Sequence, residues 1–209
     1  MKLKPQIILS NYLTRLRTIY STGLSTDETS YYPAFDDLLN SIGELLTPRI
    51  KSISQLQNKG AGIPDFGWFN FDNNDLFGVV EAKPPTENLK DVSLSEQGKK
   101  YLKKYGILLV TNYHSFQLVV QKQNEIVFEE SYSLCNKNEL FSKENLNDRA
   151  DDFVKFFRSV LLRKAPIITP QELAERLAHY AIRAKEMLAT HSVEDLKPLK
   201  DTLKSTQPK

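Results

Sequence analysis

The chain has 209 residues, of which 40% are hydrophobic and 26% are charged, so it can bury the core of one compact domain with a helical appendage. A net charge of +2 excludes a strongly basic protein, and any surface for nucleic acid must come from local clusters of basic residues. The single cysteine, Cys135, excludes an intrachain disulfide and fits a reducing, cytoplasmic setting, and no segment reaches the roughly 18 consecutive apolar residues of a membrane helix.

Helical spacing of apolar residues predicts a first helix over residues 5–20, which we interpret as part of the fold and not as a signal peptide. A second helix begins near Pro33, because proline suits the first helical turn, and Pro48 helps to end it. Alternating patterns then predict strands at 49–57, 64–71 and 76–83, a helix at 92–105 that Gly106 ends, and strands at 107–113, 116–122 and 125–134. The pattern becomes helical again at 151–162 and 170–188.

These elements predict an α/β domain over residues 1–146, in which residues 5–47 form the helical N-terminus and residues 49–134 form the sheet. Residues 147–190 are expected to form a helical connector. Residues 191–209 are polar and rich in lysine, which predicts a disordered tail.

The predicted strand at residues 76–83 carries an acidic and a basic residue at its end. Side chains alternate along a strand, which divides this one into two faces: Phe77, Val79, Glu81 and Lys83 on one, and Gly78, Val80 and Ala82 on the other. Both faces carry apolar residues, which predicts a central strand covered on both sides. Burying Glu81 and Lys83 is then costly unless they have partners.

Asp65 lies on the preceding strand, and the intervening turn can bring it close to Glu81. Two neighbouring carboxylates repel each other and raise each other's pKa, and a divalent cation relieves that repulsion. Mg²⁺ accepts one or two carboxylates and keeps several waters, and the backbone carbonyl of Ala82 could add a ligand. We therefore predict a magnesium site formed by Asp65, Glu81 and the Ala82 carbonyl, in which Mn²⁺ could substitute.

Such a site predicts the hydrolysis of phosphodiester bonds. The cation polarises the phosphate and lowers the pKa of a bound water, and Lys83 positions or deprotonates that water or stabilises charge in the transition state. The pattern acidic-x-Lys is short, and a second copy lies at Asp195–Lys197 in the polar tail. The alternative interpretation is a structural ion pair between Glu81 and Lys83, with Asp65 as a turn residue.

The helix after this strand carries a second group of candidates. Gln97 and Tyr101 are spaced i, i+4, so they lie on one helix face and could direct an amide and a phenol towards a phosphate. The residues that flank this pair and could grip the DNA backbone are Lys99, Lys100, Lys103 and Lys104. Each residue also has a structural interpretation, with Tyr101 in the core and the others on a solvated surface.

Three short motifs resemble the PD-(D/E)XK nuclease superfamily: Gly62-Ile63-Pro64-Asp65, Glu81-Ala82-Lys83, and Gln97 with Tyr101, the last similar to its RecB-like and Mrr-like branches. Over residues 11–188 the chain also resembles the N-terminal nuclease region of large bacterial restriction–modification polypeptides that carry an adenine-specific DNA methyltransferase downstream. The segments that carry this resemblance are STDETSYYPAFDDLLN, NKGAGIPDFGWF, VVEAKP, QGKKYLKKYG and LLVTNYHSFQLV.

The resemblance implies a restriction-endonuclease-like fold with three layers, α/β/α, around a central mixed sheet. It implies Asp65 and Glu81 as metal ligands, Lys83 as the catalytic lysine, and Gln97 and Tyr101 as auxiliary residues. In many members of the superfamily an acidic residue on the first core helix also contributes. The acids on the corresponding helix are Asp36, Asp37 and Glu44; we rank Asp36 first, and all three could instead be solvated helix residues.

The sequence and the resemblance together predict a magnesium-dependent endonuclease, similar to type I and type II restriction enzymes, that cleaves double-stranded DNA in a restriction–modification or defence system of the bacterial cytoplasm. The methyltransferase motif Asn/Asp-Pro-Pro-aromatic is absent, so we expect a methyltransferase or specificity partner in another domain or subunit. One site per chain predicts transient pairing of two copies on DNA. The alternatives are a DNA-binding or targeting module that does not cleave, and a domain that is active only with a methyltransferase or motor partner.

Overall fold

The computed structural model describes residues 4–24, 28–58, 60–122, 125–142, 144–164 and 170–190. The chain divides into two compact units, Met1–Pro166 and Ile167–Lys209. The first unit contains the whole sheet and the candidate site, and the second contains one long helix, α7 (Pro170–Thr190). Among the described residues, no helix combines the length and the apolar character needed to cross a membrane.

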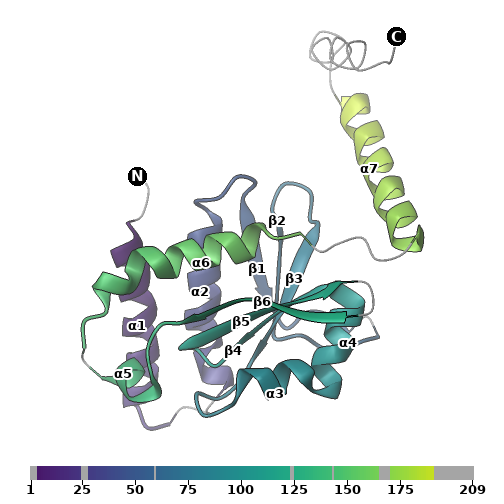
Figure 1. The fold of residues 1–209 in the computed structure, drawn as a ribbon. Helices are drawn as coiled ribbons and strands as arrows, with labels where there is room; N and C mark the ends of the chain where they lie inside the picture. The colour runs from purple at the N-terminus through teal and green to yellow at the C-terminus, as the bar shows by residue number, and fades with distance from the viewer. Residues whose placement is uncertain are drawn as a thin grey trace. The chain divides into compact units, whose positions relative to one another are not determined.

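The first unit alternates between helices and strands (Figure 1). Its elements in chain order are α1 (Pro5–Ser21), the 3-10 helix η1 (Thr29–Tyr31), α2 (Tyr32–Gly43), β1 (Ile50–Ser54), β2 (Phe66–Asn70), β3 (Leu76–Ala82), α3 (Leu89–Leu94), α4 (Glu96–Tyr105), β4 (Ile107–Thr111), β5 (Ser115–Lys122), β6 (Glu125–Ser133), α5 (Lys137–Phe141), the 3-10 helix η2 (Asn147–Arg149) and α6 (Ala150–Leu162). The positions of most elements agree with the sequence patterns.

All strands of this unit join one six-stranded sheet in the order β1-β2-β3-β4-β5-β6. Neighbouring strands are antiparallel, except that β3 and β4 are parallel. The parallel pair requires a crossover, which α3 and α4 provide, and so these helices cover the sheet beside the end of β3. The sheet is therefore mixed, as predicted.

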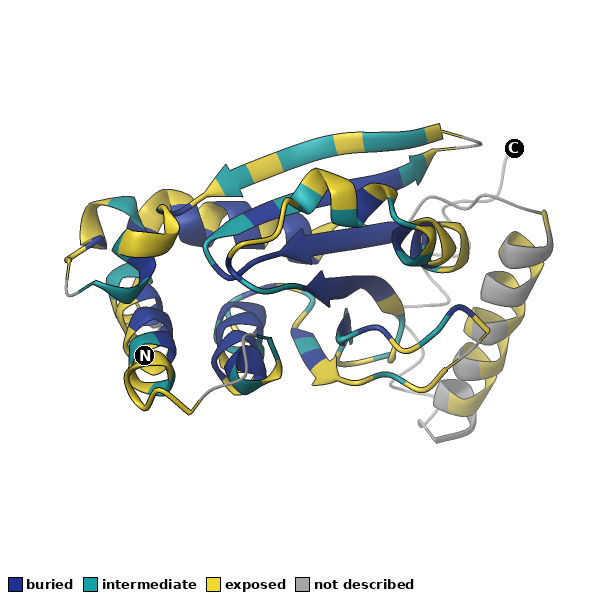
Figure 2. Cartoon of the chain, turned by 90° about the horizontal axis from the view of Figure 1, so that it is seen from below, coloured by how far each residue is buried: buried dark blue, intermediate teal, exposed yellow. Residues whose placement is uncertain are grey.

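Successive side chains of the central strands pack into two separate hydrophobic cores, one on each face of the sheet. Val80, Ala82 and Leu109 belong to the core under α1, α2 and α6, whereas Val79 and Leu108 pack with residues of α4 on the opposite face. Figure 2 shows the central strands in the colour of buried residues, while the edge strand β6 is largely intermediate or exposed. The predicted three-layer α/β/α architecture is confirmed.

The helix α4 begins and ends where local chemistry requires it. The Ser95 side chain caps the first turn by accepting a hydrogen bond from the Gly98 amide. Gly106 ends the helix in the left-handed region, with φ of 77°, which costs glycine no steric penalty. These two signals fix the register of the helix and place Gln97 and Tyr101 on its inner face.

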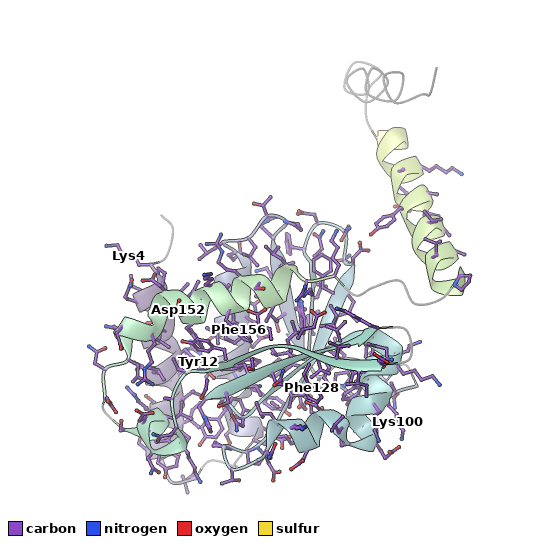
Figure 3. The ribbon with its side chains drawn as sticks, in the orientation of Figure 1. Lys4, Tyr12, Lys100, Phe128, Asp152 and Phe156 are labelled. Atoms are coloured by element: carbon purple, nitrogen blue, oxygen red, sulfur yellow. The ribbon has the colours of Figure 1, made fainter. Side chains whose placement is uncertain are left out.

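The boundary of the first unit differs from the predicted one at residue 146. The apolar stripe of α6 includes Phe153 and Phe157, both with 0% exposure, and it packs in the same core as α1 and α2. Figure 3 labels Tyr12 of α1 and Phe156 of α6, which both belong to this layer. The predicted connector at 147–190 is thus divided between the two units, and the predicted tail at 191–209 lies outside the described residues.

Candidate active site

The structure brings Asp65, Glu81 and Lys83 together at one end of the sheet. Asp65 directly precedes β2, Glu81 lies near the end of β3, and Lys83 follows β3. The antiparallel register pairs Phe66 with Val80, so the residues just beyond this pair are neighbours. The hairpin predicted from the sequence is the cause of this proximity.

Glu81 is a buried carboxylate with a close cationic partner. Its residue is 9% exposed, and its Oε1 lies 2.8 Å from Nζ of Lys83. Burial, followed by the charge of Asp65, raises the pKa of Glu81 to about 7, although the hydrogen bond and charge of Lys83 oppose that rise. The ionised carboxylate is therefore costly at this position, and a second positive charge beside it would stabilise it.

Asp65 is held by two hydrogen bonds. Its Oδ2 accepts a bond from the Ala82 amide at 2.8 Å, and its Oδ1 accepts one from the Tyr32 hydroxyl. Burial raises the pKa of Asp65, while Tyr32, the Ala82 amide and Lys83 act in the opposite direction. These bonds fix the orientation of the carboxylate without neutralising it.

The carbonyl of Ala82 faces a position that has no hydrogen-bond donor. The Lys83 amide donates to Thr111 on β4 at 2.8 Å, so the polar groups of Ala82 point the other way, towards β2. Continuing the register of β2 with β3 places Pro64 opposite Ala82. Proline has no N–H group, and so the Ala82 carbonyl is open to a ligand.

These groups fit a magnesium ion better than a metal that needs many side-chain ligands. Within the described part of the chain, no group of three His, Cys, Asp or Glu residues could hold a metal ion by itself. Two carboxylates, one main-chain carbonyl and several waters form a common ligand set for Mg²⁺. Burial raises the pKa of Asp65 and of Glu81, and a cation beside the two carboxylates would favour their ionised forms.

The structure adds Glu28, which sequence reasoning missed. Its Oε2 lies 3.7 Å from Nζ of Lys83, and the hydroxyl of Tyr32 lies 3.4 Å from its Oε1. Lys83 therefore lies between two carboxylates, Glu28 and Glu81. Glu28 comes from an irregular loop, and the only signal in the sequence is its i, i+4 spacing from Tyr32.

Asp36, the predicted auxiliary acid, lies on α2, the helix that begins at Tyr32. It is four residues further along α2 than Tyr32, about 6 Å along the axis of an ideal helix. Burial raises its pKa, Ser52 lowers it, and no group of the Asp65 and Glu81 site contributes to the shift. Glu28, and not a residue of α2, is the further acid that contacts Lys83.

Gln97 and Tyr101 form the wall of the site on α4. Nε2 of Gln97 donates to the Ala61 carbonyl at 2.6 Å, so this amide holds the glycine-rich loop that leads to Asp65. Tyr101 is 2% exposed, and burial together with the charge of Glu81 raises its pKa to about 12, while Gln97 lowers it. The four lysines predicted to contact DNA are all exposed, and Figure 3 labels Lys100 on the outer side of α4.

The contact of Gln97 with the loop depends on Gly62. This residue has φ of 103°, and a Cβ added to it would lie 2.4 Å from Nε2 of Gln97. We expect Gly62→Ala to destabilise the fold by about 1–2 kcal/mol, because it adds both backbone strain and a collision, and to slow any cleavage by about tenfold. Thermal unfolding and a plasmid assay measure the two effects.

Gly60 provides a matched control for this prediction. Its φ is 89°, and an added Cβ would have no neighbour within 4 Å. Gly60→Ala therefore has the backbone strain without the collision. Equal stability and equal cleavage by the two alanine variants would show that the contact with Gln97 does not matter.

Comparisons with known proteins place the fold but not the family. No family model and no curated protein sequence matches the chain. The structure of a DrdV–DNA complex matches with a TM-score of 0.52 and 18% identity, over 73% of this chain and 96% of that one. BpuSI, described as a type IIG restriction endonuclease, matches with a TM-score of 0.46 and 14% identity, over 63% of this chain and 16% of its own. The chain thus has the fold of a protein that was determined in complex with DNA.

Proposed function

We propose that this chain is a magnesium-dependent endonuclease domain that hydrolyses DNA phosphodiester bonds in a bacterial restriction–modification or defence system. The observation that carries the proposal is the buried Glu81 next to the half-buried Asp65 at the strand ends, with Nζ of Lys83 2.8 Å from Oε1 of Glu81. A shared fold with a protein determined in complex with DNA supports DNA as the substrate. This is also the function that the resemblance to PD-(D/E)XK nucleases implies.

Asp65, Glu81 and the Ala82 carbonyl would hold the metal ion. When bound, Mg²⁺ or Mn²⁺ supplies Lewis acidity at the phosphate and lowers the pKa of a coordinated water. The Ala82 amide and the Tyr32 hydroxyl hold Asp65 in one orientation, which pre-organises the acidic pair. In the proposal the scissile phosphate would bind next to the metal ion and Lys83.

Lys83 is better suited to stabilise charge than to remove a proton. Burial lowers its pKa, but Glu81 and then Glu28 more than offset that effect, and the pKa of Lys83 is raised overall. A raised pKa favours the ammonium form of Lys83, which suits the stabilisation of negative charge. Its role in the proposal is to donate hydrogen bonds to the negative charge that develops on the phosphate.

In the proposal, the exposed surface of α4 contacts the phosphate backbone of DNA. Lys99, Lys100, Lys103 and Lys104 are exposed on the helix whose inner face carries Gln97 and Tyr101. Each lysine could neutralise one backbone phosphate, a contact that carries no sequence information. A methyltransferase or specificity partner would then supply recognition, and two chains would meet transiently to cut both strands.

Cleavage of supercoiled plasmid tests the proposal directly. We expect nicked and linear products with Mg²⁺ or Mn²⁺ and intact plasmid with EDTA, because the acidic pair needs a cation to approach a phosphate. A parallel reaction contains a methyltransferase partner. Cleavage only in that reaction would identify a domain that is active only with the partner. Tight DNA binding without cleavage under every divalent cation, alone or with the partner, would instead establish a targeting module and reject the nuclease.

A further inference from the structure

Tyr113 occupies an unusual position in the turn between β4 and β5. The residue is fully buried, and its φ is 71°, in the left-handed region that residues with a Cβ rarely adopt. A residue keeps such a conformation only where its contacts stabilise it by more than the backbone strain costs. The contacts of Tyr113 therefore show which segments stabilise this conformation of the turn.

Three hydrogen bonds fix Tyr113 in this conformation. Its amide donates to Oγ1 of Thr111 at 2.9 Å, and its carbonyl accepts a bond from the Tyr12 hydroxyl at 2.7 Å. Its own hydroxyl donates to the main-chain carbonyl of Glu28 at 2.7 Å. Tyr113 thus connects α1 and the β4–β5 turn to the loop that carries Glu28.

The last residue of β4 holds the main chain of Lys83, and the turn after it holds the segment that follows Lys83. The Lys83 amide donates to the Thr111 carbonyl at 2.8 Å, and Nδ2 of Asn112 donates to the Glu87 carbonyl at 3.0 Å. The Lys83 side chain meets the Glu28 carboxylate at 3.7 Å. The end of β4 and the turn after it therefore locate both the backbone of Lys83 and the acid that faces its ammonium group.

We propose that Tyr113 is a positioning residue for Lys83 and acts through Glu28; this inference rests on the proposed function. The Tyr113 hydroxyl sets the main chain of residue 28, which keeps the Glu28 carboxylate within reach of the ammonium group. Glu28 then competes with Glu81 for Lys83. Without that competition Lys83 would pair with Glu81 alone, and this carboxylate would be less available to the metal ion.

A double-mutant cycle on cleavage tests the inference. We expect Tyr113→Phe to lower kcat by about tenfold with KM for DNA unchanged, because the substitution moves a catalytic group without removing a DNA contact. In a Glu28→Gln background the same substitution should change kcat by less than about twofold, since no charged carboxylate remains to be positioned. Plasmid nicking under saturating Mg²⁺ measures all four proteins.

Tyr132→Phe is the matched control. The Tyr132 hydroxyl also donates to a distant main-chain carbonyl, that of Arg149 at 3.3 Å, but it lies outside the site. Its removal should leave kcat within about twofold of the wild type. Thermal unfolding of each variant separates a loss of fold from a loss of positioning.

An equal loss of kcat from Tyr113→Phe in both backgrounds would overturn the inference, as would a kcat within twofold of the wild type. If Tyr113→Phe does not fold, Tyr12→Phe takes its place in the cycle, because it removes the bond to the Tyr113 carbonyl. A wild-type protein that never cleaves rejects the proposed function and this inference together. A wild type that cleaves, with additive variants, rejects this inference alone.

Discussion

Lys83→Met should slow plasmid cleavage by about a thousandfold without weakening the binding of Mn²⁺. The substitution keeps the aliphatic stem and removes only the ammonium group. In the proposed reaction this group stabilises charge on the phosphate and holds no metal. A loss of rate without a loss of metal affinity is therefore the expected signature of Lys83.

Substitution of the proposed metal ligands should weaken metal binding as well as slow cleavage. Glu81→Ala removes one carboxylate of the acidic pair, and Asp65→Ala removes the other. We expect each to lose cleavage and to weaken Mn²⁺ binding by at least about tenfold, because ligand loss acts on affinity and rate together. Titration calorimetry with the metal alone and plasmid cleavage report the two properties separately.

Lys122 provides a matched control for Lys83. Its Nζ lies 2.6 Å from Oε1 of Glu129, so it also forms a close acid–lysine pair, but on β5 and β6, away from the site. Lys122→Met should cleave at the wild-type rate. If Lys83→Met also cleaves at that rate, Glu81 and Lys83 form the structural ion pair that the short motif also allows.

Strand periodicity made much of the site predictable. The alternation along β3 predicted that Val79 and Glu81 share one face and that Val80 and Ala82 share the other. Val79 and Val80 do lie in different cores, on opposite faces of the sheet. The same argument placed Phe77 with Val79, which is wrong. The register of β2 and β3 shifts between Trp68 and Phe69, and Phe77 joins the core of Val80 instead. A local bulge of this kind has no signal in the alternating pattern.

Contacts between distant segments could not be predicted in the same way. Glu28 reaches Lys83 because the Tyr113 hydroxyl, from a residue 85 positions further along the chain, holds the main chain of its loop. Asp36 satisfied the helical expectation, yet its position along α2 places it beside Ser52. The spacing of apolar residues predicts which side of a helix or strand is buried. It does not predict which residues of two different elements come into contact, because that depends on how the elements pack.

The limit of the core was missed for a related reason. The stripe of α6 is clear in the sequence, but periodicity does not say whether a helix packs on its own domain or on another one. Phe153 and Phe157 of this helix lie in edge-to-face contact, with ring centroids 5.1 Å apart, in the core shared with α1 and α2. Only the packed structure assigns this helix to the first unit.

Glu81→Gln should raise the free energy of unfolding of the metal-free protein by about 2–3 kcal/mol at pH 8, although it removes a residue essential to the proposed reaction. Burial and the Asp65 charge raise the pKa of Glu81 to about 7, against about 4.5 in the unfolded chain. Glutamine resembles the protonated side chain, so the variant avoids the cost of the buried charge. Active-site groups often oppose stability in this manner.

The sign of the pH dependence follows from the direction of this shift. Between about pH 4.5 and pH 7 the native state binds more protons than the unfolded state, so stability contributed by Glu81 falls as pH rises and stays low above pH 7. The raised pKa of Lys83 acts only at alkaline pH. The two proteins should therefore be equally stable near pH 4.5 and diverge towards pH 8. Urea unfolding at several pH values measures the difference.

Magnesium should reverse the order of stability. Binding to the native state stabilises the wild type by RT ln(1 + [Mg²⁺]/Kd), and the glutamine variant gains little because it lacks a ligand. Glu129→Gln is the control, because the Glu129 side chain is also 11% exposed but faces two cations, Lys122 and Arg163. That variant should lose stability, with and without the metal. A Glu81→Gln variant that is less stable than the wild type at pH 8 without metal would instead show that Glu81 supports the fold, and the acidic pair would lose its functional explanation.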